Sequence, residues 1–139
     1  MKKKQFLLLG LVVGLISAYV IWSTFLKTAP STTSLDTEVE ITANELYQAF
    51  DSDETEANAL YLNKILEVNG VVTSIDESED LKPSISLTTE GFGVIKCSFE
   101  TAEDFDPKSV SVGAQITVKG ECIGYLLDVL IRNSIILTD

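Results

Sequence analysis

Two cysteines, Cys97 and Cys122, are the residues of this sequence best suited to covalent chemistry. Each falls on the apolar face of a segment in which apolar and polar residues alternate, so both thiols are predicted to point into a core. In an oxidising compartment such a pair can form a disulfide, whereas two buried cysteines can also remain free thiols. The sequence has no Cys-x-x-Cys, so a redox or metal-binding role is the least favoured of the three alternatives.

The sequence contains no histidine. This absence excludes Ser-His-Asp and Cys-His nucleophile systems, and it excludes zinc or haem bound through histidine. The acidic run from Asp51 to Glu56 suggests a calcium loop, but an EF-hand needs glycine at its sixth position and glutamate at its twelfth. Those positions hold Glu56 and Leu62. We therefore predict no catalytic residue, no metal site and no cofactor, and the numerous carboxylates leave acid–base catalysis by a carboxylate pair as an alternative.

Five segments show the apolar–polar alternation of a half-buried strand. In the first, residues 65–76, Leu66, Val68 and Val72 share one face, and Gly70 is predicted to bend the strand. The other four predicted strands cover residues 84–88, 93–99, 115–124 and 128–137. In the last of these the residues predicted to share a face are Val129, Ile131, Ile135 and Leu137. A long first strand, bent so that it can belong to two sheets, favours a small five-stranded Greek-key barrel.

Two short helices are predicted ahead of the barrel. Residues 41–50 begin with Thr42 and Glu45, the Thr-x-x-Glu spacing of a capping box, and an apolar stripe follows. A second, shorter stripe runs from Ala57 to Tyr61. The fold class predicted for residues 41–139 is therefore mainly β, with N-terminal helices.

The N-terminal region has the pattern of a membrane anchor. Residues 1–5 form a basic cap, and the stretch from Phe6 to Leu26 carries no charge. As a helix this stretch would span about 31 Å, which matches the hydrocarbon core of a bilayer. The positive-inside rule then places the cap in the cytoplasm and the rest of the single-pass chain outside it. The alternative is a cleaved signal peptide. Residues 27–40 have the composition of a short linker.

The charge of the chain argues against nucleic acid as a partner. The formal net charge is −11, from 21 acidic and 10 basic residues, and four of the ten basic residues flank the apolar stretch. Binding to a phosphate backbone relies on clustered lysine and arginine. Residues 41–139 contain no such cluster in sequence, so nucleic acid is an unlikely partner for them.

Several motifs resemble the tRNA-anticodon-binding-domain-like (tRNA_anti-like) family, over roughly residues 41–137. The most distinctive is the Gly-x-Cys-x-Gly of residues 120–124. The others are Leu46-Tyr47, Ala57-Asn58, Tyr61-Leu62, the run from Val68 to Val72, the run from Val94 to Phe99, Val118-Lys119 and Asp128-Val129. The resemblance implies an OB-fold barrel in a small membrane-attached protein of the bacterial envelope. With the orientation predicted for the anchor, the barrel is expected on the outer side of the inner (cytoplasmic) membrane.

OB folds bind ligands on the outer face of their second and third strands. Here the polar residues expected on that face are Ser84, Ser86, Thr88, Lys96 and Ser98, with Phe92 at the rim. The first functional hypothesis is a membrane-anchored, non-catalytic interaction module that binds a protein or another envelope component. The second is a binder of oligonucleotide or oligosaccharide through the same face, and the third is an enzyme that uses carboxylates.

Overall fold

A computed structural model of the chain describes Gly14, Ser17 and residues 32–77, 82–101 and 104–137. The chain divides into two units, residues 1–30 and 31–139, and the second is described here by itself. The predicted basic cap and all but Gly14 and Ser17 of the predicted anchor lie outside the described residues, as do residues 27–31 of the linker. No helix within the described ranges is long and apolar enough to cross a membrane.

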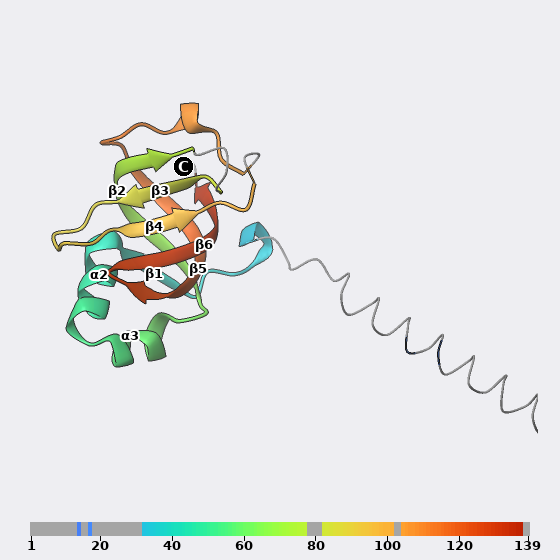
Figure 1. Ribbon diagram of the computed structural model, residues 1–139, viewed down its shortest axis with the longest axis vertical. Helices are drawn as coiled ribbons and strands as arrows, with labels where there is room; N and C mark the ends of the chain where they lie inside the picture. The colour runs from blue at the N-terminus through green and yellow to red at the C-terminus, as the bar shows by residue number, and fades with distance from the viewer. Residues whose placement is uncertain (1–13, 15–16, 18–31, 78–81, 102–103, 138–139) are drawn as a thin grey trace, which may run out of the picture. The chain divides into compact units, whose positions relative to one another are not determined.

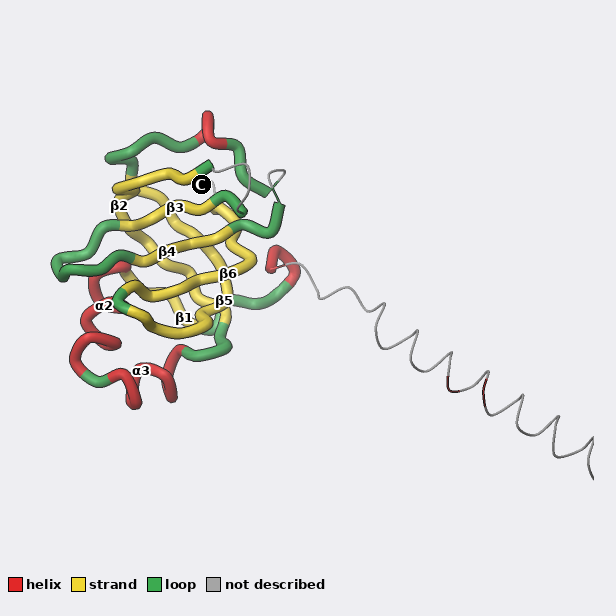
Figure 2. Tube along the Cα trace, viewed as in Figure 1, coloured by secondary structure: helices red, strands yellow, loops and turns green. Residues whose placement is uncertain are grey.

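The second unit is a barrel of β-strands with helices at one end (Figures 1 and 2). In chain order the elements are η1 (Thr32–Ser34), β1 (Val39–Thr42), α2 (Ala43–Ser52), α3 (Glu54–Tyr61), β2 (Ile65–Asp76), β3 (Ser84–Leu87), β4 (Ile95–Ser98), η2 (Pro107–Ser109), β5 (Gln115–Leu126) and β6 (Asp128–Leu137). The five strands predicted from alternation are all present, close to their predicted bounds.

The barrel closes through β2. The strand order is β1-β2-β3-β4-β6-β5, and β2 also pairs with β5. This additional pairing closes β2, β3, β4, β6 and β5 into a ring of five strands. β2 pairs with β5 from Ile65 to Val71 and with β3 from Val72 to Asp76. The change of partner follows Gly70, where an added Cβ would lie 2.8 Å from the Cβ of Ala43. The bend predicted at this glycine is therefore where the barrel needs a residue without a side chain.

The predicted capping box of Thr42 and Glu45 is present. The helix that it caps, α2, begins at Ala43, two residues after the predicted start. The backbone N–H of Glu45 donates to the hydroxyl of Thr42 over 3.2 Å, and the backbone N–H of Thr42 donates to the carboxylate of Glu45 over the same distance. The Thr42 hydroxyl also donates to the Glu45 carboxylate, over 2.8 Å, and this bond together with the one from the Thr42 N–H holds the pKa of Glu45 below its usual value. The residues before the helix differ from the prediction of a linker, because Val39–Thr42 forms β1 and pairs in parallel with β2.

The core fills the barrel, and the two ends are covered differently. Leu46 and Phe50 of α2 are almost completely buried, and Phe50 stacks on Tyr125 of β5 with ring centroids 5.7 Å apart. Towards the η2 end, Phe99 stacks on Phe105 at 4.7 Å. The helices α2 and α3 therefore close one end of the barrel, and the η2 connection passes over the other (Figure 1).

The second half of β6 differs from the predicted pattern. Its register against β5 shifts between Lys119 and Glu121, where β6 carries one extra residue, and Asn133 in this bulge has a φ of 50°. An extra residue in one strand of a pair moves every later side chain to the opposite face. Ser134 and Ile136 therefore face the core, and the prediction that Ile135 shares a face with Val129 and Ile131 is wrong, as it is for Leu137.

The bulge also buries a hydroxyl. Ser134 is only 1% exposed, and its Oγ has no hydrogen-bond partner among the described residues. An unpaired buried hydroxyl is costly, so Ser134→Ala should raise the free energy of unfolding by about 1 kcal/mol. Urea denaturation of the full-length protein in nonionic detergent would measure this, with Ser86→Ala as the half-exposed control. A loss of stability in Ser134→Ala would mean that the hydroxyl does have a partner in solution.

Candidate functional site

The polar residues predicted for the ligand face lie on neighbouring strands. Ser86 of β3 pairs with Lys96 of β4, and Ser84 pairs with Ser98. Lys96 is exposed and Ser86 and Ser98 are half-buried, so these three side chains share an accessible surface. Ser84 is only 5% exposed and adds nothing to this surface. We call the outer surface of β3, β4 and β6 around Lys96 the Lys96 face.

Lys96 supplies a cation at the centre of this face. Its ammonium group makes no ion pair or hydrogen bond with any residue that the structure describes. Its neighbour in the register of β6 is Leu130, which is half-buried and supplies an apolar contact surface. Across β3, Ser86 pairs with the exposed Ser74 of β2. The centre of the face is therefore a lysine among hydroxyls, with one leucine beside it.

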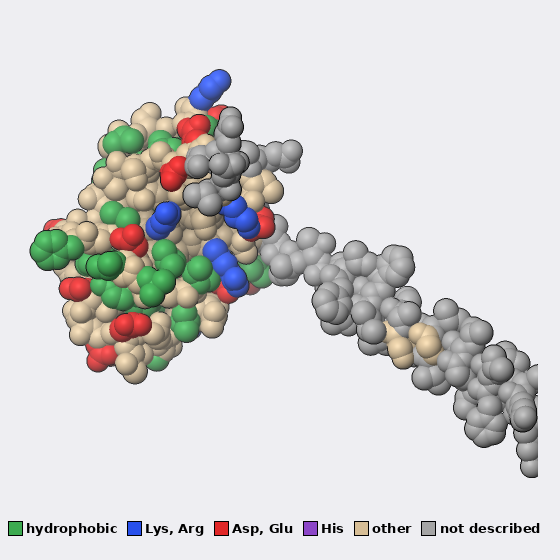
Figure 3. Space-filling model, viewed as in Figure 1, with side chains coloured by type: hydrophobic (Ala, Val, Ile, Leu, Met, Phe, Trp, Pro, Cys, Tyr) green, Lys and Arg blue, Asp and Glu red, His purple; other side chains and the backbone are tan. Residues whose placement is uncertain are grey.

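Two ion pairs lie around Lys96. The ammonium group of Lys82 is 2.8 Å from a carboxylate oxygen of Glu100, just beyond the end of β4. The guanidinium of Arg132 donates two hydrogen bonds, of 3.0 and 3.2 Å, to the carboxylate of Glu121. The resulting fork holds the guanidinium in place and raises the pKa of Arg132. Lysine and arginine side chains accordingly gather over β4 and β6 on the side that Figure 3 shows.

The remaining two predicted residues lie towards the β3–β4 loop. Thr88 is exposed just after β3 and donates its backbone N–H to the carbonyl of Val71. Phe92 is fully exposed at the loop, so its ring is available but does not cover Lys96. The loop is held in place beneath Phe92, because the Gly93 N–H donates to the Tyr47 hydroxyl over 3.1 Å. Leu126 and Leu127 of the β5–β6 turn are also largely exposed.

Sequence reasoning missed the contributions of β2 and β6 to this face. Ser74, Leu130 and Arg132 reach it only because β3 lies between β2 and β4, and β4 pairs in parallel with β6. The positions of β2 and β6 beside β3 and β4 are set by closure of the barrel. The alternation of apolar and polar residues within a strand does not indicate which strands lie beside it.

The two cysteines are buried free thiols. Cys97 of β4 and Cys122 of β5 both pair with Ile131 of β6, so one strand lies between them. Strands two apart are separated by roughly 9–10 Å, whereas a disulfide needs Cα atoms within about 7 Å. The disulfide alternative therefore does not hold for the folded barrel. Burial raises the pKa of Cys97 to about 12, and burial together with the carboxylate of Glu121 raises that of Cys122.

The acidic run between α2 and α3 has a structural role. Asp53 is the N-cap of α3, and its carboxylate accepts the backbone N–H of Glu56 over 3.0 Å. No group of three or more acidic or cysteine side chains in the described ranges is placed to hold a metal ion.

Comparisons with known proteins agree with the barrel topology. One solved structure, from Klebsiella pneumoniae subsp. pneumoniae MGH 78578, is of a lipoprotein to which nucleic-acid binding is provisionally ascribed. It is 17% identical to this chain, with a TM-score of 0.57, and the match covers 70% of this chain and 91% of the other. At this identity the likeness shows the fold alone. No curated protein matches the sequence.

The family comparison covers nearly the whole sequence. The pattern of the tRNA_anti-like family matches residues 1–136, which includes β1 to β5 and all of β6 except its last residue, Leu137. The resemblance noted in the sequence is thereby confirmed, and the chain belongs to the tRNA_anti-like family.

Proposed function

We propose that this protein is a non-catalytic binding module of the bacterial cell envelope, and that the Lys96 face binds an acidic group of a partner protein or another envelope component. The observation that carries the proposal is the free ammonium group of Lys96 amid Ser74, Ser86 and Ser98. A lysine without an ion-pair partner is a ready contact for a carboxylate or phosphate. The half-buried Leu130 beside it adds apolar area to the contact.

The proposal places the barrel outside the cytoplasm, held to the membrane by the stretch from Phe6 to Leu26. The absence of charge in this stretch and the lysines at residues 2–4 support that placement. The linker predicted for residues 27–40 is short, so the proposal has the module work close to the bilayer. The barrel is acidic, so partners are expected among proteins and neutral envelope material more than among anionic lipids.

A non-catalytic role is supported by the chemistry of the titratable groups. A general acid is usually marked by a carboxyl pKa raised through burial or a neighbouring carboxylate. Glu45, on the first turn of α2, has its pKa lowered by hydrogen bonds from Thr42, which is a capping effect. The buried thiols have raised pKa values, which is the opposite of what a nucleophilic cysteine needs.

Photo-crosslinking in living cells tests the proposal. A photoreactive amino acid at Ser86, in the full-length protein, should capture one dominant partner protein that mass spectrometry can identify. Lys96→Glu should lower the yield of that product about tenfold or more, because it replaces the attraction with repulsion. Lys108→Glu is the matched control, since Lys108 is exposed at η2, and it should leave the yield unchanged. An equal yield with Lys96→Glu, or no product above background, would contradict the proposal.

A second candidate is an oligonucleotide or oligosaccharide ligand on the same face. The provisional nucleic-acid binding of the structurally similar Klebsiella lipoprotein favours the oligonucleotide. The same crosslink separates the candidates, because nuclease or glycosidase digestion would then collapse the product and no partner protein would be recovered. This candidate stays second because the net charge is acidic and because Phe92 is the one aromatic residue predicted for this face, where single-strand binders stack bases on several.

A further inference from the structure

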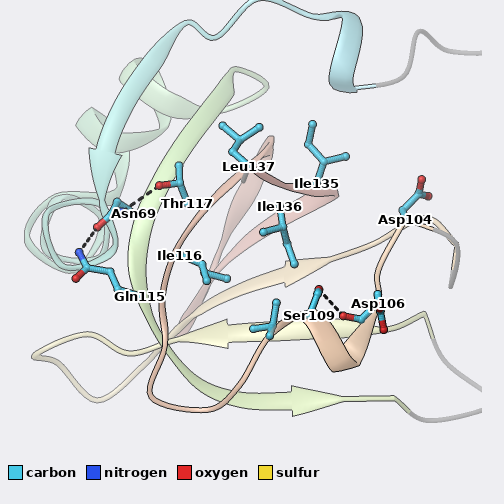
Figure 4. A pocket seen from close by; sticks show the side chains of 11 residues that line it. Asn69, Asp104, Asp106, Ser109, Gln115, Ile116, Thr117, Ile135, Ile136 and Leu137 are labelled. Carbon is cyan, nitrogen blue, oxygen red and sulfur yellow. Dashed lines mark hydrogen bonds between the residues drawn. The ribbon is translucent and has the colours of Figure 1, made fainter. Parts of the chain in front are cut away.

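A separate cavity of about 850 Å³ lies at the η2 end of the barrel (Figure 4). Its walls come from the start of β5, the end of β6 and the β4–β5 connection. The apolar residues among its lining are Val110, Ile116, Ile135, Ile136 and Leu137. Asp104 and Asp106 stand at one side, and Asn69 and Gln115 at the other (Figure 4). No residue of the Lys96 face lines this cavity.

The cavity meets β6 along its edge. Three consecutive residues of the strand, Ile135, Ile136 and Leu137, line it. Successive side chains of a strand point to opposite faces, so a cavity that borders three in a row reaches past the side or the end of the strand. Figure 4 shows these three side chains directed to different sides of the β6 ribbon.

That edge of β6 is open to pairing. β4 pairs with β6 only from Val129 to Ile131, while β5 occupies the other side of β6 as far as Leu137. In the part of the chain that the structure describes, no strand pairs with residues 132–137 on the β4 side. An unpaired strand edge presents N–H and C=O groups, and an extended peptide can hydrogen-bond to them as an added strand.

The charges at the rim select the peptide. Asp104 uses one carboxylate oxygen, Oδ2, to accept the N–H and hydroxyl of Thr101, and Asp106 uses Oδ1 to accept the N–H of Lys108. Within the described ranges, the second oxygen of each carboxylate accepts no hydrogen bond and is open to a ligand. No lysine or arginine is among the described residues that line the cavity. The apolar wall and acidic rim together complement a segment that alternates apolar and basic side chains.

We propose that this groove binds an extended peptide of a partner protein, which adds to the edge of β6 and carries lysine or arginine towards Asp104 and Asp106. The apolar side chains of the peptide pack against Ile116 and Ile135. The groove and the Lys96 face are different sites with opposite charge preferences, so this inference does not depend on the function proposed above.

Selection from a displayed library of random ten-residue peptides, on full-length protein in nonionic detergent, tests this inference. Enriched peptides should alternate apolar residues with lysine or arginine. By fluorescence anisotropy, Asp104→Lys and Ile135→Lys should each weaken the best peptide about tenfold or more. Glu40→Lys, an exposed acid on β1, is the matched control and should change affinity less than about twofold.

A second control tests the strand pairing itself. N-methylation of alternate peptide bonds on the pairing side removes the donors of an added strand, and it should weaken binding about tenfold or more. Failure to enrich any peptide, enrichment of acidic peptides, or binding unaffected by Ile135→Lys or by N-methylation would each overturn the proposal. A concentration-dependent dimer that Ile135→Lys dissociates would also overturn it, because the groove would then hold a second copy of the chain.

Discussion

Phe50→Ala should lower the free energy of unfolding by about 3–5 kcal/mol, the loss typical of a buried phenylalanine. Phe50 is 1% exposed and lies between two rings, stacked on Tyr125 at 5.7 Å and tilted towards Tyr61 at 6.2 Å. The side chain thus joins α2 to both α3 and β5. Its removal leaves a cavity where the helices close the barrel, and domains of this size have only about 5–15 kcal/mol of stability to lose.

Urea denaturation of the full-length protein in nonionic detergent, followed by circular dichroism of the β-sheet signal, would measure the loss. Leu60→Ala is the control, because Leu60 of α3 is 47% exposed and should cost less than about 1 kcal/mol. Equal effects of the two substitutions would mean that α2 and α3 do not pack on the barrel as described.

The second large effect is a loss of stability at alkaline pH caused by Cys97. Burial raises the pKa of this thiol to about 12 in the folded state, compared with about 8.5 in an unfolded chain. The folded state therefore keeps a proton that the unfolded state releases. The contribution is fully present below about pH 8.5, and it is lost at about 1.4 kcal/mol per pH unit as the pH rises towards 12.

Denaturation midpoints at several values between pH 8 and pH 11 would measure this slope. Cys97→Ala should be less stable at pH 7 because of the smaller side chain, yet its stability should fall less steeply with pH. The burial of Cys122 adds a second slope of the same sign, and the variant leaves that one in place. Parallel curves for the two proteins would show that Cys97 titrates normally and is not buried.

Alternation in the sequence predicted each barrel strand because neighbouring strands bury one face against a common core. It failed where pairing partners decide the conformation. Val39–Thr42 alternates apolar and polar residues, but only its parallel pairing with β2 makes four residues a strand. Asn133 is the residue that could have indicated the bulge, because asparagine tolerates a positive φ better than most residues. The apolar–polar alternation alone does not indicate an extra residue at this position.

The binding surfaces were predictable to different degrees. Ser86, Lys96 and Ser98 could be placed together because β3 and β4 are consecutive and antiparallel. The groove at the η2 end could not be predicted, because Asp104 and Ile135 come from distant segments. These segments meet only after the barrel closes and the bulge in β6 has turned Ile135 away from the core.

The position of Ile131 between the two cysteines has a consequence for the order of folding. The pairing of β4 with β6 joins distant segments, and such non-local pairings form later than local ones. In a chain whose β6 has not yet paired with β4 or β5, no strand holds the sulfur atoms of Cys97 and Cys122 apart. A covalent link made at that moment would trap the chain with β6 excluded from its place. In an oxidising compartment, the yield of native protein therefore depends on docking outpacing oxidation, and a bridged monomer is a marker of misfolded chains.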